Sequence, residues 1–404
     1  MVANVCVSAF TAKNINRGRA FHRKRLRCVH RGATELCSTS NHAYECETHM
    51  VKEIDYKVEL DGSSRIRDIC HVVKTMVTAW ADIPDEEFSV KEVQGGVTNK
   101  LYNCGPPDNH GVLIRIYGNQ SEILIDRDGE LKNLVHIYKN GFAPKFYGFF
   151  KNGFVYGFFP GRDLTPQGWY PLAHVTCDLM VADLQEGKFT EEIARQMALW
   201  HQQEVPSAPR DEPSLFVKLN SWLSLVPTHY ETPEKQKKFE IILNQWDIQE
   251  EAKFLREALE AVDSPIVFAH NDLIGKNIIY DEATDEIHFI DYEYGAYNFR
   301  AFDLANHFCE FAGFELDYSK YPPKEMQYKY FRTYFSTFYN REATEEDLHN
   351  MYVEISRFAL ASHFMWATWG LVQGEISDID FDFMQYAVDR FSQYYLIRDS
   401  VLAL

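Results

Sequence analysis

HNDLIGKN, residues 270–277, and FIDYEY, residues 289–294, are the stretches that decide the fold. Asp272 and Asn277 are five residues apart, and Asp291 follows fourteen residues after Asn277. Each stretch alone is typical of a turn, because Asp and Asn are common turn residues. Both together, in this order and with these gaps, match the catalytic loop and the metal-binding segment of phosphotransfer enzymes.

The residue types fit the chemistry of phosphoryl transfer. A carboxylate must orient the acceptor hydroxyl and take its proton, and oxygen ligands must hold Mg²⁺ against the phosphates. Asp272 fits the first role, whereas Asn277 and Asp291 fit the second. Glu293 would share a face with Asp291 in an extended strand. We therefore predict Asp272, Asn277 and Asp291 as catalytic residues, Asn277, Asp291 and Glu293 as metal ligands, and ATP and Mg²⁺ as cofactors.

The segment expected to bind the nucleotide phosphates departs from the protein-kinase pattern. Residues 94–100 read QGGVTNK, where a protein kinase has G-x-G-x-x-G. A Gly-Gly pair lets backbone N–H groups approach phosphate, although a hairpin turn is the simpler alternative. Arg115 stands in the third strand, where kinases have Lys, and Glu130 on the next helix could orient it. The predicted nucleotide-binding residues are Gly95, Gly96, Thr98, Asn99, Arg115 and Glu130.

Composition narrows the class of protein. The chain has 404 residues, of which 46% are hydrophobic, and a formal charge of -18, which disfavours nucleic-acid binding. Residues 1–34 carry eight Lys and Arg and no acidic residue, which predicts a disordered basic extension or, alternatively, a mitochondrial-type presequence. The eight cysteines include no C-x-x-C, so we expect a reduced, cytoplasmic setting. No apolar run is long enough to span a membrane.

The hydrophobic patterns predict two lobes. The first is β-rich with one internal helix: strands are expected at 88–93, 101–104 and 112–118, a helix at 126–141 and a hairpin at 145–159, after a helix at 66–80. The second is mainly helical, with helices expected at 191–203, 250–262, 325–339 and 345–375. The predicted fold is therefore α+β and protein-kinase-like. The predicted divisions are a basic extension 1–50, a nucleotide-binding lobe 51–160 and a helical lobe 161–404.

Aromatic residues near the C-terminus suggest a site for a cation. Trp366 and Trp369 are three residues apart on a predicted helix and share a face, and Tyr386 follows. Aromatic faces attract cations, and Glu310 could supply a carboxylate. Core packing is the alternative for the two tryptophans. We predict Glu310, Trp366, Trp369 and Tyr386 as substrate-binding residues.

HNDLIGKNIIY, HFIDYEYGAYNFRAFDLANHFCEFAG and FALASHFMWATWGLVQ closely resemble the choline/ethanolamine kinase family over residues 88 to 395. The resemblance implies ATP-dependent phosphorylation of an amino alcohol, with Asp272 as the base. It places Mg²⁺ on Asn277 and Asp291. It also implies that Asp303 braces the catalytic loop. A homodimer and a monomer both stay open.

Two segments resemble the members of this family that use ethanolamine: DRDGELKN, residues 126–133, and CEFAGFELDYSKYP, residues 309–322. The resemblance thus implies formation of phosphoethanolamine, the first step of phosphatidylethanolamine synthesis by the CDP-ethanolamine route. A choline kinase or a dual enzyme is the alternative, since tryptophan faces also suit a quaternary ammonium. A non-catalytic module of the same fold is the alternative from another class. Residues 162–192 look like an insert relative to the family.

Overall fold

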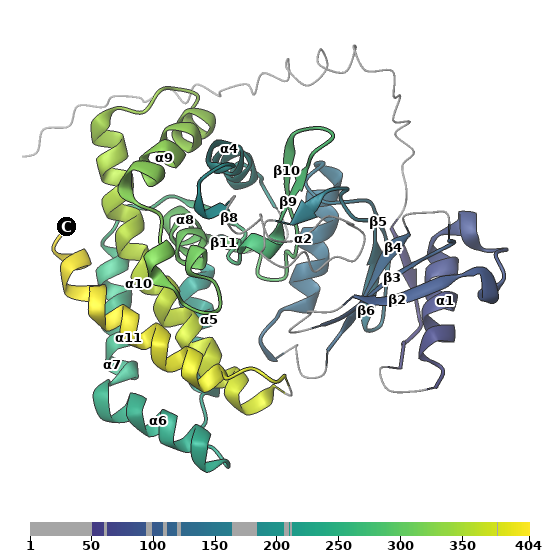
Figure 1. Ribbon diagram of the computed structural model, residues 1–404, viewed down its shortest axis with the longest axis horizontal. Helices are drawn as coiled ribbons and strands as arrows, with labels where there is room; N and C mark the ends of the chain where they lie inside the picture. The colour runs from purple at the N-terminus through teal and green to yellow at the C-terminus, as the bar shows by residue number, and fades with distance from the viewer. Residues whose placement is uncertain are drawn as a thin grey trace, which may run out of the picture. The chain divides into compact units, whose positions relative to one another are not determined.

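The computed structural model describes residues 51–59, 63–93, 99–107, 111–118, 123–163, 184–205, 210, 212–377 and 379–404 (Figure 1). These residues belong to one compact unit, Val51–Leu404. Three predictions lie outside the described residues, wholly or in large part. They concern the basic extension 1–50, the phosphate-loop residues Gly95, Gly96 and Thr98, and the insert at 162–192.

A six-stranded sheet forms the β-rich lobe. Its strands are β1 (Lys52–Ile54), β2 (Ser89–Val93), β3 (Asn99–Gly105), β4 (Val112–Tyr117), β5 (Phe146–Phe150) and β6 (Gly153–Tyr156). Their spatial order is β1-β5-β6-β4-β3-β2. Only β1 and β5 are paired in parallel, so the predicted strands form a continuous antiparallel sheet with one strand added at its edge. The hairpin predicted at 145–159 is confirmed as β5 and β6.

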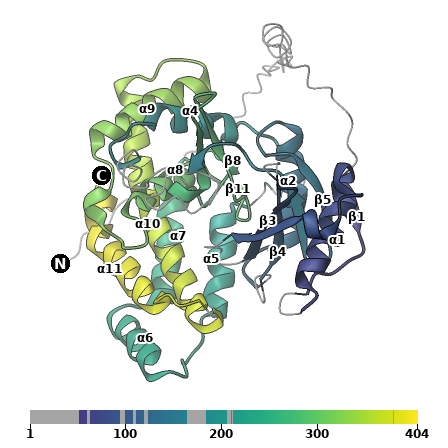
Figure 2. The same ribbon diagram turned by 45° about the vertical axis from the view of Figure 1, so that its right-hand side comes forward.

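Two helices pack on opposite faces of this sheet (Figures 1 and 2). On one face, Ile114 and Ile116 of β4 share a buried cluster with residues of α1 (Arg65–Met76). On the other, Phe154 shares a cluster with residues of α2 (Arg127–Lys139). The helices expected at 66–80 and 126–141 are thus confirmed as α1 and α2. Because side chains alternate along a strand, Arg115 points to the α2 face.

Eight helices make up most of the second lobe, as far as the structure describes it. They are α4 (Thr190–His201), α5 (Ser214–Leu225), α6 (Pro233–Gln245), α7 (Ile248–Glu260), α8 (Arg300–Cys309), α9 (Lys324–Tyr339), α10 (Glu345–Ile376) and α11 (Phe383–Leu402). α10 lies at the centre, packed against α8 and α11 (Figure 2). It begins at a capping box formed by Thr344 and Asp347. None of the described helices has the length and apolar character needed to cross a membrane.

The predicted α+β, protein-kinase-like fold is confirmed, and the two motifs lie on short strands between α7 and α8. β8 (Ile266–Ala269) pairs with β11 (Ala296–Phe299), and β9 (Ile278–Asp281) pairs with β10 (Glu286–Phe289). β7 (Arg162–Asp163) adds a third strand beside β9. This arrangement holds HNDLIGKN between β8 and β9, and FIDYEY at the end of β10.

Candidate active site

The turn after β8 is held by Asn271. Asn271 has a φ of 66°, a left-handed conformation that Asn tolerates better than most residues. Its Nδ2 donates to the Tyr294 carbonyl at 2.9 Å, and its Oδ1 accepts from Asn298 Nδ2 at 2.7 Å. Both partners lie at or beside β11, so the β8–β11 pair fixes the backbone immediately before Asp272.

Asp303 braces the same loop from α8. Its carboxylate accepts the backbone N–H of His270 at 2.7 Å and that of Asn271 at 2.6 Å. His201 Nε2 lies 3.0 Å from the same carboxylate. Burial alone would raise the pKa of Asp303, but the hydrogen bonds from His201 and from the His270 backbone N–H oppose burial, and the pKa is lowered. The bracing role predicted for Asp303 is confirmed by these contacts.

The register of the β9–β10 hairpin brings Asn277 beside Asp291. Phe289 stands opposite Ile278, and the next residue, Ile290, donates its N–H to the Asn277 carbonyl at 2.9 Å. Asp291 follows with a φ of 65°, another left-handed position at which Asp is favoured. Asn277 Nδ2 donates to the Asp272 carbonyl at 2.8 Å. The three predicted catalytic residues therefore lie close together.

Arg115 joins the β-rich lobe to this group. Its Nη1 lies 2.8 Å from Asp291 Oδ1, and its Nη2 forms an ion pair with Glu293. Glu130 of α2 lies 3.6 Å from Nη1, as expected for a residue that orients the guanidinium. Burial alone would lower the pKa of Arg115, but the three carboxylates raise it well above its ordinary value, so Arg115 is charged. Its predicted contact with nucleotide phosphate stays a prediction.

Arg127 completes this network and was not predicted. Its Nη1 lies 2.8 Å from Glu130 Oε2, and its Nη2 donates to Asn99 Oδ1 at 2.9 Å. Asn99 in turn donates to Glu293 at 3.0 Å. Arg127 lies within DRDGELKN, so the signal was in the sequence, but an arginine at a helix start is usually a surface charge. Asn99 is the one predicted phosphate-loop residue that the structure describes.

The oxygen ligands at this site fit a hard divalent cation. Asp291 and Glu293 offer carboxylates, and Asn277 offers an amide oxygen, because its Nδ2 is already bound to the Asp272 carbonyl. Such oxygen ligands suit Mg²⁺, which usually keeps waters and phosphates in its remaining positions. Among the described residues, no three His, Cys, Asp or Glu side chains gather as a metal site.

The pKa values of Asp272 and Asp291 are shifted in opposite directions. Burial raises the pKa of the half-buried Asp272 well above its ordinary value, and Lys276 opposes that shift. Asp291 is the reverse case: burial alone would raise its pKa, but Arg115 and Lys276 outweigh burial and lower it. A base works best when its pKa approaches the working pH, whereas a metal ligand must be ionised. The two shifts therefore match the two predicted roles.

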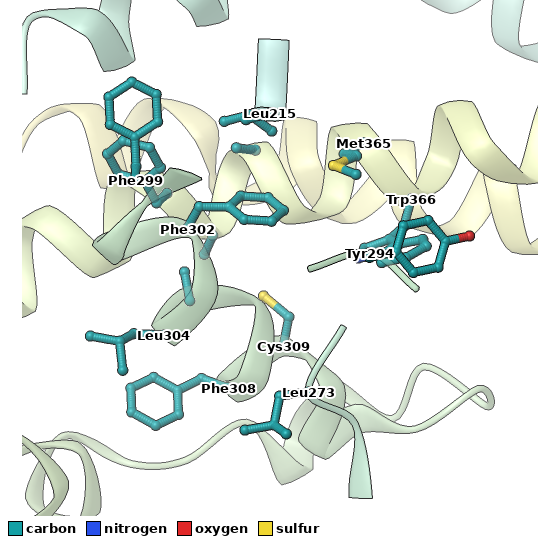
Figure 3. Close-up of a cluster of buried hydrophobic side chains, with 14 of the residues drawn as sticks. Leu215, Leu273, Tyr294, Phe299, Phe302, Leu304, Phe308, Cys309, Met365 and Trp366 are labelled. Carbon is teal, nitrogen blue, oxygen red and sulfur yellow. The ribbon is translucent and has the colours of Figure 1, made fainter. Parts of the chain in front are cut away.

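The predicted amine-binding residues also come together. The rings of Trp366 and Trp369 lie edge to face, 5.6 Å apart, and Tyr386 lies 6.2 Å from Trp369. Trp366 also packs on Tyr294, with the ring centres 5.5 Å apart (Figure 3). Tyr294 is the residue after Glu293. Asn306, which accepts from Trp366, also donates to the Asn271 carbonyl at 3.2 Å. The aromatic cluster therefore lies next to the loop that carries the predicted base.

Two residues that hold this cluster were missed by sequence reasoning. Arg390 is fully buried; its Nη2 lies 2.5 Å from Glu310 Oε1, and its Nε donates to the Tyr386 hydroxyl at 3.1 Å. Asn306 of α8 accepts from Trp366 Nε1 at 2.7 Å. Arg390 stands four residues after Tyr386, a spacing that places both on one helix face and could have revealed the pair.

Comparisons with known proteins agree with this geometry. Residues 90–395 match the choline/ethanolamine kinase family. A relative from Dictyostelium discoideum, named probable ethanolamine kinase A, is 38% identical over 84% of this chain and 93% of its own. The solved Plasmodium vivax ethanolamine kinase is 26% identical, with a TM-score of 0.69 over 83% of this chain and 89% of its own. A choline kinase from Cryptosporidium parvum is 25% identical, with a TM-score of 0.67 over 83% and 96%.

Proposed function

The chain belongs to the choline/ethanolamine kinase family, and we propose that it transfers the γ-phosphoryl group of ATP to ethanolamine, giving phosphoethanolamine and ADP. The observation that carries this proposal is the convergence of Asp272, Asn277 and Asp291 beside an aromatic cluster that includes a carboxylate. A base, metal ligands and an ammonium site are the parts that this reaction requires.

Sequence relatives favour ethanolamine over choline as the acceptor. The relative that matches at 38% identity carries an ethanolamine kinase name, whereas the two solved structures, one of each kind, are about equally similar in fold. Fold likeness therefore does not separate the two amines. Phosphoethanolamine would then be the first intermediate of phosphatidylethanolamine synthesis by the CDP-ethanolamine route.

The residues divide the work as follows. Asp272 accepts the proton of the ethanolamine hydroxyl and orients that hydroxyl for attack on the γ-phosphorus. The faces of Trp366 and Trp369, with the Glu310 carboxylate, hold the ammonium group. Asn277, Asp291 and Glu293 would hold Mg²⁺. When bound, Mg²⁺ neutralises charge on the phosphates.

Arg115 also acts on the carboxylates predicted to bind the metal. Its guanidinium lowers the pKa of Asp291 and forms ion pairs that orient both Asp291 and Glu293. We propose that phosphate oxygens take over one side of this fork when nucleotide binds, because guanidinium binds phosphate and carboxylate with the same geometry.

Choline is the second candidate acceptor. A quaternary ammonium has no N–H donor and depends on aromatic faces, and this site offers Trp366, Trp369 and Tyr386 side by side. A primary ammonium instead donates three hydrogen bonds and gains more from Glu310.

An amine panel tests the proposal. The full chain is assayed with ATP and Mg²⁺ against ethanolamine, choline and no amine. We expect phosphoethanolamine as product and a higher kcat/KM for ethanolamine than for choline. A higher kcat/KM for choline would mean that choline, and not ethanolamine, is the preferred acceptor. An absence of turnover with every amine would instead support the non-catalytic module.

A further inference from the structure

Lys218 lies on the inward face of its helix, and the mechanism above does not use it. It lies on α5, three residues after Leu215 and four before Trp222, and both of these side chains are buried. Residues at these spacings share one helix face, so Lys218 lies on the stripe that packs inward. A lysine is unusual on such a stripe unless something inside requires its charge.

The ammonium of Lys218 points at the end of the FIDYEY motif. Its Nζ donates to the Tyr294 carbonyl at 3.1 Å and lies 4.8 Å from the centre of the Tyr294 ring. Among the residues that the structure describes, it makes no other hydrogen bond and no ion pair. An ammonium has three donors, so two N–H groups stay available.

Three carboxylates act on Lys218 through their charges. Glu293 and Asp272 act on it from the helical lobe, and Asp126, which caps α2, acts on it from the β-rich lobe. Even so, burial outweighs these charges and lowers the pKa of Lys218 to about 8. The carboxylate charges therefore only partly offset the burial of this cation, and an anionic ligand would complete the compensation.

The position of Lys218 indicates which anionic group it would bind. The Tyr294 carbonyl that binds Lys218 also accepts from Asn271 Nδ2 at 2.9 Å, so the ammonium lies where the residue before Asp272 meets the residue after Glu293. Asp272 marks the acceptor hydroxyl and Glu293 marks the metal side, which places this cation beside the phosphoryl group that moves between them. The amine cannot be the ligand, because it is itself a cation. Arg115 and Arg127 approach from the β-rich lobe, and Lys276 belongs to the catalytic loop itself, whereas Lys218 approaches from α5 with two unused donors.

We propose that Lys218 contacts the transferred phosphoryl group, as the γ-phosphate of ATP before the reaction and as the phosphate of the product afterwards. This inference rests on the proposed phosphotransfer function. In the step itself the acceptor oxygen bonds to the γ-phosphorus, and the bond from that phosphorus to the β–γ bridging oxygen breaks. The hydroxyl proton passes to Asp272, and ADP leaves with the electron pair. Lys218 stabilises charge on the non-bridging oxygens throughout.

The proposal predicts that Lys218 distinguishes nucleotides by their third phosphate. Lys218→Met keeps the apolar stem and removes the charge. We expect Kd for β,γ-imido-ATP with Mg²⁺ to rise roughly 10- to 100-fold, as loss of one charge-assisted contact implies. Kd for ADP should stay unchanged, and kcat should fall roughly 10²- to 10³-fold. Lys218→Arg should recover part of both losses, because it restores the cation.

Lys253→Met is the matched control. Lys253 is an exposed lysine on α7 that pairs with Glu250, so its removal should change neither Kd nor kcat. Equal weakening of ADP and β,γ-imido-ATP by Lys218→Met, or no weakening of either, would overturn the proposal in favour of a structural role. If Lys218→Met does not fold, Lys218→Gln supplies the same comparison. Nucleotide binding is measured without amine, so an error in the ethanolamine assignment would not affect the result.

Discussion

Asp272 is the residue on which turnover should depend most. Replacement by Asn keeps the size of the side chain and the turn but removes the proton acceptor. We expect kcat of Asp272→Asn to fall roughly 10²- to 10⁴-fold. Kd for ADP should change little, because Asn277 bonds to the backbone carbonyl of residue 272, which stays in place. Steady-state kinetics and nucleotide titration measure the two quantities.

Asp285→Asn provides the matched control for this substitution. Asp285 lies in the exposed turn between β9 and β10 with a φ of 60°, a conformation that Asn also adopts readily. Its replacement should leave kcat unchanged. A near-normal kcat for Asp272→Asn would contradict the assignment of the base.

Arg390 should control the affinity for the amine rather than for ATP. Arg390→Met leaves Glu310 as a buried carboxylate without its partner and releases the Tyr386 hydroxyl. We expect a severalfold rise in KM for ethanolamine, an unchanged KM for ATP and a loss of roughly 3–5 kcal/mol of stability. Substrate titrations and thermal unfolding measure these effects.

The control for Arg390 lies on the same helix. Arg398 of α11 pairs with Glu251, away from the aromatic cluster, at 2.9 Å. Arg398→Met should lower the melting temperature slightly and leave both KM values unchanged. Parallel rises in the two KM values for Arg390→Met would mean that Arg390 supports the fold in general and not the ammonium site.

Residue spacing correctly predicted which polar groups lie together, because the proposed chemistry demands them at fixed gaps. Asp272, Asn277 and Asp291 could be assigned from two short motifs, and their proximity follows from one hairpin register. Arg390 could not be assigned in this way. Its role depends on α11 lying against the loop after α8, a contact between segments 80 residues apart.

At the scale of elements, the close approach of α10 and α11 sets the shape of the ammonium site. A Cβ at Gly370 would lie 3.0 Å from the Phe383 carbonyl and 3.3 Å from the Ala387 Cβ. Gly370→Ala should therefore push the start of α11 outwards, carrying Tyr386 with it. We expect a loss of about 1–3 kcal/mol in stability and a higher KM for ethanolamine.

Gly374→Ala tests the same helix pair at a more tolerant position. A Cβ there would meet the flexible side chain of Met384, with the sulfur 2.6 Å away. Met adapts its conformation readily, and alanine favours the helix by about 1 kcal/mol over glycine. We expect unchanged or higher thermal stability and an unchanged KM. If Gly370→Ala behaves in the same way, backbone contact between the helices is not what positions Tyr386.

Two of the helices that the sequence did not predict, α5 and α11, share one physical feature. α4, α7, α9 and α10 have apolar residues at regular helical spacing and were predicted close to their observed bounds. α5 and α11 carry a charged residue, Lys218 or Arg390, on the face that packs inward. Such a residue interrupts the apolar period. Both residues have a role at the site in our proposals, in line with the general observation that functional positions break local rules.

At the scale of the whole described unit, the site depends on two lobes that no local pattern connects. Arg115 of β4 reaches Asp291, 176 residues further along the chain. Its direction could be inferred from strand alternation, but its partner could not, because that depends on how the sheet and the helical lobe pack. The same holds for Arg127 and Glu293, which lie 166 residues apart.

The helical lobe also contains four histidines that burial keeps neutral: His201, His270, His307 and His363. Burial lowers the pKa of His307 to about 4 despite its hydrogen bond to the Leu273 carbonyl. In the unfolded chain a histidine titrates near pH ~6.5. Between these values the unfolded state binds a proton that the folded state does not, so these groups reduce stability as pH falls.

We therefore expect His307 to make the fold acid-sensitive below about pH 6.5, by roughly 1.4 kcal/mol per pH unit and about 3 kcal/mol by pH 4. Burial raises the pKa of Asp272 and Glu130, which acts in the opposite direction, so the comparison between variants is decisive. His307→Gln should flatten the fall in melting temperature between pH 7.5 and 5, whereas His349→Gln, at an exposed position on α10, should not. Identical pH slopes for wild type and His307→Gln would show that His307 takes up its proton in the folded state as readily as in the unfolded chain.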